Sequence, residues 1–583
     1  MSLMPFEMKA CRGDCGRECG HDFASCPVFP RLTPELQELC KENLHLLQYL
    51  HNLPEDIGMP EYVAALSRNL KTKKDPNLIY PATEEVYIHI LRNPEDVRNH
   101  YIPIEPCLSE GQDSFLDEME TRLADYVEEL EGVTEAAARI DLVMSIVDRI
   151  VVVRGKGMGK VNTRGTGMFG ALRGGVAVKE KITLTPFQYR SVRYLLRRKL
   201  EGLGVLQPMI DDPNIEDISC SGLGNIFVEH KVFGGLTSSI GFESHEELDK
   251  FVIQLAEGIK HPVTFREPCV DATLPDGSRI NIVYGTDVSK RGSNFTIRKF
   301  SDTPLSILEL IQFGALNYDM AAYLSIILQE GMNAWVAGET ASGKTTLMNA
   351  LTTFIAPEAK IVSIEDTPEV QVPHHNWIRG CTRGSGKNSE SSEVSMFDLL
   401  KAALRQRPNL IIVGEIRGEE GAIAFQAMQT GHACMSTFHA ASVNKLIQRV
   451  TGHPINVPKT YVDNLNVVII AQQVRLPSGK PARRLTSINE IVSYDSVSDS
   501  FSFIEVFNWD PVTDSFHFRG NQNSYLLEYK IAPRRGLSHE RRREIYKMLK
   551  ARAESLRKIH EQGKSDFYQL YGILSKAIRD AKF

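Results

Sequence analysis

Apolar and polar residues alternate with helical spacing in some parts of the chain and with strand spacing in others. Residues 32–53 are apolar at helical spacing, and Thr33 and Pro34 supply a helix cap and a first-turn proline. Residues 77–106 are typical of short strands interrupted by prolines. A charged amphipathic stretch over residues 114–151 predicts one long helix. Together these segments predict a small α+β module.

Two further patterns follow in the rest of the chain. Between residues 185 and 300, helices and strands alternate and end in a hairpin with the turn Pro275-Asp276-Gly277, which predicts a second α+β domain. From residue 304 to about 475, helices alternate with short apolar strands, as in a parallel sheet covered on both faces. Strands near residues 487–507 and a charged helical tail from Ser538 complete the chain. The predicted fold class is α/β.

Composition and charge exclude several classes of protein. The chain has 583 residues, of which 42% are hydrophobic and 24% charged, so disordered, collagenous and coiled-coil proteins are excluded. The net charge of −6 gives no overall cationic field for nucleic acid or anionic lipid. The apolar runs are shorter than the ~20 residues that span a bilayer, and residues 1–12 lack a secretory signal pattern. We expect a cytoplasmic protein that reaches a membrane through partners.

Residues 154–175 differ abruptly from their surroundings, with eight glycines, several basic residues and no acid. Such a stretch buries too little apolar surface to order itself, so we interpret it as a linker, with a basic arm that touches lipid or a neighbouring chain as the alternative. The expected segments are a cysteine-rich segment (1–30), a helical and α+β module (31–153), the linker (154–178), an α+β domain (179–300) and an α/β domain with a helical tail (301–583).

The clearest chemical signal is GETASGKT, in the phosphate-loop pattern G-x4-G-K-[ST], between an apolar strand and a helical run. Its glycines let backbone N–H groups surround an oxyanion, and the following helix N-terminus favours negative charge. Lys344 reaches the terminal phosphates and the Thr345 hydroxyl holds Mg²⁺. The motif therefore predicts a bound nucleotide with Mg²⁺; that the nucleotide is ATP is implied by the family resemblance described below. The other residues expected to contact the nucleotide are Gly338, Glu339, Thr340, Ala341, Ser342, Gly343 and Thr346.

Acidic residues follow two more predicted strands. Glu415 ends the strand that begins at residue 409, and Glu365 and Asp366 end the strand that begins at residue 360. In a parallel nucleotide-binding sheet these strand ends meet at one edge, so the acids can converge on the phosphate loop. Glu365 is the candidate that polarises water, and Glu415 the candidate for the Mg²⁺ shell. The alternatives are a solvated strand end for Glu415 and a turn or helix cap for Asp366.

Histidines and cysteines add two weaker signals. His432 and His439 flank a short strand in GHACMSTFHA and could sense the nucleotide state; zinc binding is the alternative, although no cysteine or acid stands at ligand spacing. Near the chain start, Cys11, Cys15, Cys19 and Cys26 form C-x3-C-x3-C-x6-C. In a reducing compartment four thiolates suit Zn²⁺ or an iron–sulfur cluster, with His21 as a replacement ligand and free thiols as the alternative.

The motifs GETASGKTT, IEDTPE, LIIVGEIRG and GHACMSTFHA, in this order over residues 185–494, resemble the secretion ATPase superfamily of type II secretion, type IV pilus and archaellum motors. The YPATEEVY stretch and the C-terminal tail resemble its archaeal branch. The resemblance implies a RecA-like ATPase domain, preceded by an N-terminal α+β domain that caps the nucleotide, in a ring that is usually a hexamer. Paired CxxC motifs, found beyond the Walker B region in many bacterial members, are absent here.

The resemblance also assigns residue roles. Glu365 is similar to the catalytic base and Glu415 to the Walker B glutamate. Arg279 and Arg298 resemble arginines that the N-terminal domain brings to the nucleotide, where a guanidinium neutralises charge on phosphoryl oxygens. Weaker candidates for that role are Arg291, Arg405 and Arg417.

The expected function is an oligomeric Mg-ATPase that drives subunits of a pilus-like filament through a polytopic membrane platform protein. Archaellum rotation is one alternative. A RecA-like nucleic-acid translocase is another, but the acidic net charge and the lack of a basic-aromatic stripe argue against it, and we expect no nucleic-acid partner.

Overall fold

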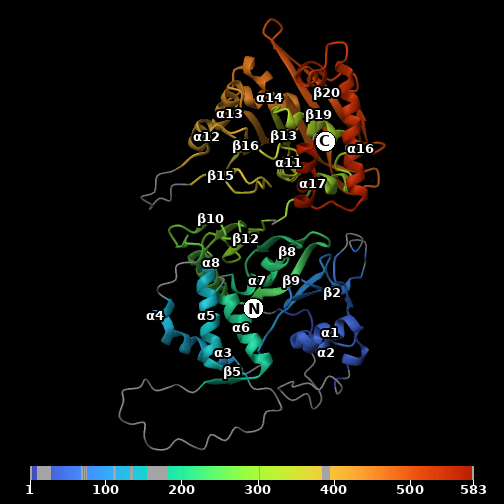
Figure 1. The fold of residues 1–583 in the computed structure, drawn as a ribbon. Helices are drawn as coiled ribbons and strands as arrows, with labels where there is room; N and C mark the ends of the chain where they lie inside the picture. Colours follow the sequence, from blue (N-terminus) through green and yellow to red (C-terminus); the bar gives the residue numbers. More distant parts are fainter. Residues whose placement is uncertain are drawn as a thin grey trace, which may run out of the picture. The chain divides into compact units, whose positions relative to one another are not determined.

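The computed structural model folds the chain into two compact units, Met1–Ser301 and Asp302–Phe583, each with its own large sheet (Figure 1). The structure describes residues 3–8, 26, 28–66, 70, 73, 75–108, 113–130, 136–153, 181–200, 203–300, 303–383 and 394–580. Among these residues, no helix combines the length and apolar character needed to cross a membrane. The five-segment division remains a prediction.

The first unit is built on a ten-stranded sheet in the order β1-β2-β3-β4-β9-β8-β7-β12-β11-β10. Its strands are β1 (Glu61–Tyr62), β2 (Asn77–Pro81), β3 (Tyr87–Leu91), β4 (His100–Ile104), β7 (Ile215–Cys220), β8 (Gly224–His230), β9 (Gly234–Phe242), β10 (Cys269–Thr273), β11 (Arg279–Val283) and β12 (Asn294–Arg298). The parallel pairing of His100 with Thr237 joins β4 to β9. Strands from before and after the glycine-rich segment therefore share one sheet.

Helices cover this sheet and form a smaller core of their own. They are α1 (Pro34–Glu42), α2 (Leu44–Asn52), α3 (Asp113–Leu123), α4 (Val127–Leu130), α5 (Ala136–Ile150), α6 (Pro186–Leu200), α7 (Gln207–Asp211) and α8 (His245–Gly258). The prediction of one helix over 114–151 is wrong, because a 3₁₀ turn, Ala124–Tyr126, ends α3. Met119 of α3 and Val147 of α5 pack in one cluster, which a straight helix would hold about 42 Å apart. Beside them, β5 (Val151–Val153) pairs with β6 (Ile182–Leu184).

The second unit has a nine-stranded sheet in the order β15-β14-β16-β17-β13-β18-β19-β20-β21. Its strands are β13 (Ala334–Gly338), β14 (Ile361–Glu365), β15 (Trp377–Cys381), β16 (Leu410–Ile416), β17 (Ala433–Phe438), β18 (Val467–Arg475), β19 (Pro481–Asp495), β20 (Ser500–Asp510) and β21 (Ser515–Phe518). Pairing is parallel from β15 to β18 and antiparallel from β18 to β21. The predicted α/β class is confirmed.

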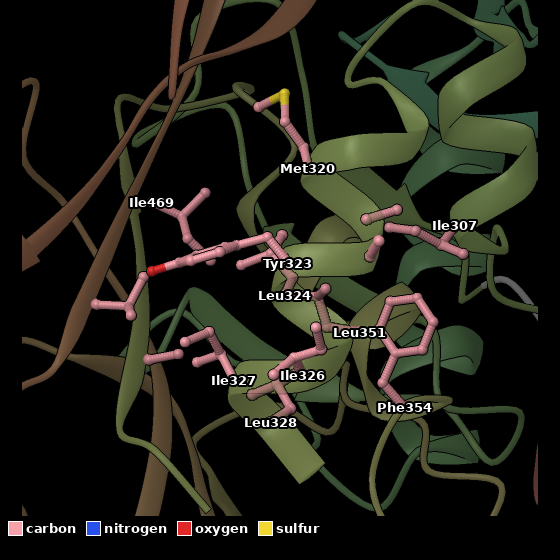
Figure 2. Close-up of a cluster of buried hydrophobic side chains, with 14 of the residues drawn as sticks. Ile307, Met320, Tyr323, Leu324, Ile326, Ile327, Leu328, Leu351, Phe354 and Ile469 are labelled. Atoms are coloured by element: carbon pink, nitrogen blue, oxygen red, sulfur yellow. The ribbon is translucent and has the colours of Figure 1, made fainter. Parts of the chain in front are cut away.

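Helices line both faces of this parallel region. They are α9 (Ile307–Gln312), α10 (Tyr318–Gln329), α11 (Lys344–Thr352), α12 (Met396–Arg405), α13 (Glu420–Gln429), α14 (Val443–Thr451), α15 (Ala532–Arg534), α16 (Ile545–Glu561) and α17 (Phe567–Arg579), with a π-helical turn at Leu526–Ile531. Figure 2 shows the core on one face, where Tyr323 and Ile327 of α10 lie with Leu351, Phe354 and Ile469. On the other face Trp335 of β13 stacks on Phe438. All five residues of β13 are buried, which explains its unbroken apolar pattern.

Candidate nucleotide site

The phosphate loop connects β13 to α11. Ala341 has φ +61° and Gly343, the residue before α11, has φ +88°, so the loop turns through two left-handed positions. A Cβ at Gly338 would lie 2.2 Å from the Ala471 carbonyl oxygen and 2.5 Å from Ser342 Oγ. Glycine is therefore required where the loop leaves β13. The N-cap residue Gly343 has no side chain to cap α11, which leaves the first N–H groups of the helix suited to an oxyanion.

The loop's own donors converge on one carbonyl. Lys344 Nζ lies 3.0 Å and Ser342 Oγ 2.8 Å from the Glu339 carbonyl oxygen, and both donate to it. Burial lowers the pKa of Lys344, against an opposing effect of Glu415. A cation and a hydroxyl that can turn to an incoming oxyanion fit a bound nucleotide phosphate. Glu339, Thr340 and Ala341 are exposed, whereas Gly343, Lys344, Thr345 and Thr346 are half-buried.

Glu365 is the last residue of β14 and is only 2% exposed. Its Oε1 accepts hydrogen bonds from the N–H groups of Glu369 (2.9 Å) and Val370 (2.7 Å). Its Oε2 lies 3.7 Å from Arg379 Nε and accepts no hydrogen bond from the residues that the structure describes. Burial raises the pKa of Glu365 to about 7, against the opposing effects of the backbone donors and Arg379. The side chain can therefore exchange a proton near neutral pH.

Glu415 stands on β16, the strand next to β14. The pairing with β17 shifts by one residue between Val413 and Glu415, which leaves Gly414 as a bulge. A Cβ at Gly414 would lie 3.1 Å from Glu365 Cγ, so the bulge packs against the Glu365 side chain. Glu415 Oε2 accepts from Arg417 Nε (3.1 Å) and Nη2 (2.5 Å), and the Glu415 side chain is 28% exposed. The structure brings Glu365 and the Glu415 strand end together, as predicted from the sheet.

The remaining candidates of the second unit are placed with local partners. Asp366 accepts a hydrogen bond from Thr382 Oγ1 at 3.2 Å. His432 Nδ1 lies 3.1 Å from Thr430 Oγ1, and the His439 carbonyl accepts from Arg449. The roles predicted for Asp366, His432 and His439 remain predictions. Arg405 ends α12, and Arg417 is the ion-pair partner of Glu415.

Arg279 and Arg298 belong to the first unit. They face each other in register on β11 and β12, and both are exposed. Arg279 donates to both carboxylate oxygens of Asp271, at 3.2 and 2.9 Å, and Arg298 stands opposite Asp217 of β7. Like charges in register repel one another, so the flanking aspartates stabilise this row. A role of either arginine at the phosphate loop remains a prediction, as does that of Arg291, whose carbonyl accepts from Leu223 N–H.

The cysteine candidates are only partly described. Cys11, Cys15 and Cys19, with His21, lie outside the described residues. Cys26 is 2% exposed, with Sγ 3.5 Å from His51 Nδ1, in a cluster that also contains Cys40. Within the part of the chain that the structure describes, no three metal-ligating side chains gather at one point. The Zn²⁺ or iron–sulfur site remains a prediction.

Sequence reasoning missed two arginines at the phosphate-binding edge. Arg379 stands on β15, opposite Ser363 of β14, and approaches Glu365. Arg483 of β19 donates from Nε to the Ala341 carbonyl at 2.9 Å. Arg483 is 142 positions from Ala341, and Arg379 reaches Glu365 through the pairing of β14 with β15. A local signal for Arg483 was the pair Arg483-Arg484 in a strand beyond a tight turn.

Comparison with known proteins identifies the family. The family model described as type II/IV secretion system protein matches residues 199–581. The chain is 44% identical over 545 residues to the uncharacterized protein MJ0900 of Methanocaldococcus jannaschii, covering 93% of this chain and 96% of that protein. It is 30% identical over 271 residues to the type IV secretion system protein PtlH of Bordetella pertussis, covering 43% and 79%. The solved structure of the ATPase DotB of Legionella pneumophila matches 50% of this chain and 79% of that chain, with 21% identity and a TM-score of 0.36. The chain belongs to the family of type II/IV secretion system proteins.

Proposed function

We propose that this protein is a Mg²⁺-dependent ATPase that binds ATP at the loop between β13 and α11. The observation that carries the proposal is the buried Glu365 carboxylate. One of its oxygens accepts from two backbone N–H groups and the other accepts no hydrogen bond from the described residues, at the carboxyl end of β14 in the same sheet as the strand that leads into the loop. A carboxylate with this geometry and a pKa near neutrality is suited to activate water. Surface carboxylates lack both properties.

The chain's own residues divide the chemistry among them. Lys344 leaves the Glu339 carbonyl to bind the terminal phosphates, and the α11 N-terminus binds their oxygens. When bound, Mg²⁺ neutralises charge that develops on the phosphoryl oxygens. Thr345 and, through water, Glu415 are the residues that would hold this ion. Glu365 Oε2 accepts the proton of the attacking water while Oε1 stays fixed by Glu369 and Val370.

Hydrolysis drives motion in this proposal because the chain consists of two units with separate cores. ATP favours a closed arrangement of the first unit on the second through Arg279 and Arg298, and loss of the γ-phosphate releases it. The working form is a homo-oligomer, a hexamer by family resemblance. It acts at the cytoplasmic membrane through a polytopic platform protein and powers assembly or secretion of pilus-like filament subunits.

The test is the Mg²⁺-dependent ATP hydrolysis rate per chain, measured over a wide dilution series. Lys344→Ala should reduce the rate by about 10³-fold, because the charge that neutralises the phosphates is lost. Lys360→Ala is the matched control, since Lys360 precedes β14, at the end of the parallel strands opposite to the phosphate loop, and donates to the Gln406 carbonyl. Its rate should equal that of the unmodified chain.

Dilution then tests the oligomer. A per-chain rate that falls on dilution, with a native mass that falls in parallel, supports a site completed by a neighbouring chain. Unchanged hydrolysis by Lys344→Ala would remove the ATPase assignment. A native mass equal to that of a monomer, in a sample with full hydrolysis activity, would contradict the proposed ring.

A further inference from the structure

We propose that Arg483 is a positioning residue that holds the phosphate loop in the conformation that binds nucleotide. The inference rests on the proposed ATPase function, since it concerns the same loop. Its basis is the hydrogen bond from Arg483 Nε to the Ala341 carbonyl, at 2.9 Å, across 142 positions of sequence. The Arg483 stem also reaches the start of α11, because a Cβ at Gly343 would lie 3.5 Å from Arg483 Cδ.

The sheet places Arg483 at this loop. β18 pairs on one side with β13, where Gly338 stands opposite Ala471, and on the other side with β19, where Gln473 stands opposite Arg483. Arg483 is therefore two strands from the strand that leads into the phosphate loop. The tight turn between β18 and β19 fixes the register of the hairpin.

The neighbouring arginine anchors the strand. Successive strand residues point to opposite faces, so Arg483 and Arg484 diverge. Arg484 is 5% exposed and donates to both oxygens of Asp514, each at 2.8 Å, and to the Phe313 carbonyl at 3.1 Å. This bidentate pair fixes β19. The Arg483 side chain, which lies on the exposed face of β19, is thereby held at a fixed position relative to the phosphate loop.

The hydrogen bond sets the direction of a loop peptide. In a trans peptide the Ala341 C=O and the Ser342 N–H point in opposite directions. Because Arg483 holds the carbonyl outward, the Ser342 N–H points back into the loop, where it lies 3.4 Å from the Glu339 carbonyl oxygen. Lys344 Nζ and Ser342 Oγ donate to the same oxygen. Arg483 thus keeps the donors on the side where phosphate oxygens bind.

Ala341 needs such support because of its backbone. A φ of +61° is unfavourable for any residue with a Cβ, so without an external partner for its carbonyl Ala341 gains by relaxing to a negative φ, which would displace that carbonyl and the Ser342 N–H. Glycine adopts this conformation freely. The substitution Ala341→Gly should therefore reduce the loop's dependence on Arg483, which gives the proposal a signature that a general loss of stability would not produce.

The experiment measures ATP binding by titration with a fluorescent ATP analogue, and KM and kcat for hydrolysis, in the full-length chain. Arg483→Gln should raise Kd and KM about tenfold and change kcat less than about twofold, since a charged hydrogen bond to the loop is lost. In the Ala341→Gly background the same substitution should raise Kd less than about threefold. Arg475→Gln, an exposed arginine of the same hairpin, is the matched control and should bind as the unmodified chain does.

The outcomes separate this inference from the proposed function. If Lys344→Ala abolishes hydrolysis while Arg483→Gln binds ATP normally, the ATPase stands and the role of Arg483 is overturned. A loss confined to kcat would also overturn it, because Arg483 would then act on the transition state. If Arg483→Gln weakens ATP binding equally in the unmodified chain and in the Ala341→Gly background, Arg483 does not act by supporting the backbone conformation of Ala341. If Lys344→Ala hydrolyses ATP normally, the proposed function itself fails.

Discussion

Two glutamates stand at the ends of adjacent parallel strands in the second unit, Glu365 as the last residue of β14 and Glu415 as the next-to-last residue of β16, and one is buried whereas the other is partly exposed. Ile364, just before Glu365, pairs with Val413, just before the Gly414 bulge, so the two strand ends lie side by side. Glu365 is 2% exposed and held by backbone N–H groups, whereas the Glu415 side chain is 28% exposed and paired with Arg417. Two neighbouring strand ends of one sheet therefore give one carboxylate suited to proton transfer and one suited to a solvated cation.

A single glycine produces much of this difference. Gly414 has no Cβ, so Glu365 can pack against it, and its bulge advances Glu415 by one residue relative to β17. The Gly414 carbonyl is fixed by a hydrogen bond from Thr437 Oγ1 at 2.6 Å. The comparison teaches that the chemistry of a strand-end acid depends on the backbone beside it as well as on its own position.

The largest expected effect comes from removing the buried acid. Glu365→Gln keeps the shape and an oxygen that accepts from Glu369 and Val370, but removes the proton acceptor, so kcat should fall about 10²–10³-fold. ATP binding should stay within about threefold. Steady-state kinetics and nucleotide titration measure both, and the exposed Glu358→Gln is the matched control. Near-normal turnover would contradict the role of Glu365.

The same substitution should stabilise the second unit at alkaline pH. The folded pKa of about 7 lies above the ordinary 4.5, so the folded chain binds the proton more tightly and its stability falls as pH rises through this range. Replacing the acid by glutamine should therefore gain about 3 kcal/mol at pH 8 and less than about 1 kcal/mol at pH 5.

Urea unfolding followed by tryptophan fluorescence measures this gain, since Trp335, Trp377 and Trp509 all lie in the second unit. Glu358→Gln should show no such dependence on pH. A gain that is equal at both pH values would mean that packing, rather than charge burial, separates Glu365 from Glu415.

A smaller effect is expected at the exposed acid. Glu415→Gln should raise the Mg²⁺ concentration needed for half-maximal hydrolysis about tenfold, because one charge is lost from the cation shell. The pH at which the rate is half-maximal should not move. Mg²⁺ titrations at fixed ATP measure the first quantity and pH–rate profiles the second. If Glu415→Gln instead abolishes turnover as Glu365→Gln does, the division of roles between the two acids is wrong.

The sequence predicted this site where its parts are contiguous and missed it where they are not. GETASGKT, IEDTPE and LIIVGEIRG each stand at the end of a parallel strand, as their local pattern predicts, and the catalytic roles of their residues remain predictions. The bond between Arg483 and Ala341 spans 142 positions and depends on the order of strands in the sheet. The pairing of His100 with Thr237 depends on sheet order in the same way. Helical periodicity also continues through α3 and α5, and only their shared core shows that the chain folds back between them.

The smallest expected effect is a shift in the pH dependence of kcat, which should distinguish Arg379, the arginine near Glu365, from Arg417, the arginine paired with Glu415. Arg379 lowers the pKa of Glu365, whereas burial and Glu369 raise it. The kcat of the unmodified chain should rise with pH and level off above an inflection near pH 7, because the ionised carboxylate is the active form. Arg379→Gln removes a favourable charge, so the inflection should move to higher pH while the plateau is largely retained. Arg417→Gln, which loses a contact to Glu415 instead, should leave the inflection in place and alter the Mg²⁺ requirement. Identical pH profiles for the two variants would show that Arg379 does not act through Glu365, and would leave burial alone as the cause of the difference between the two glutamates.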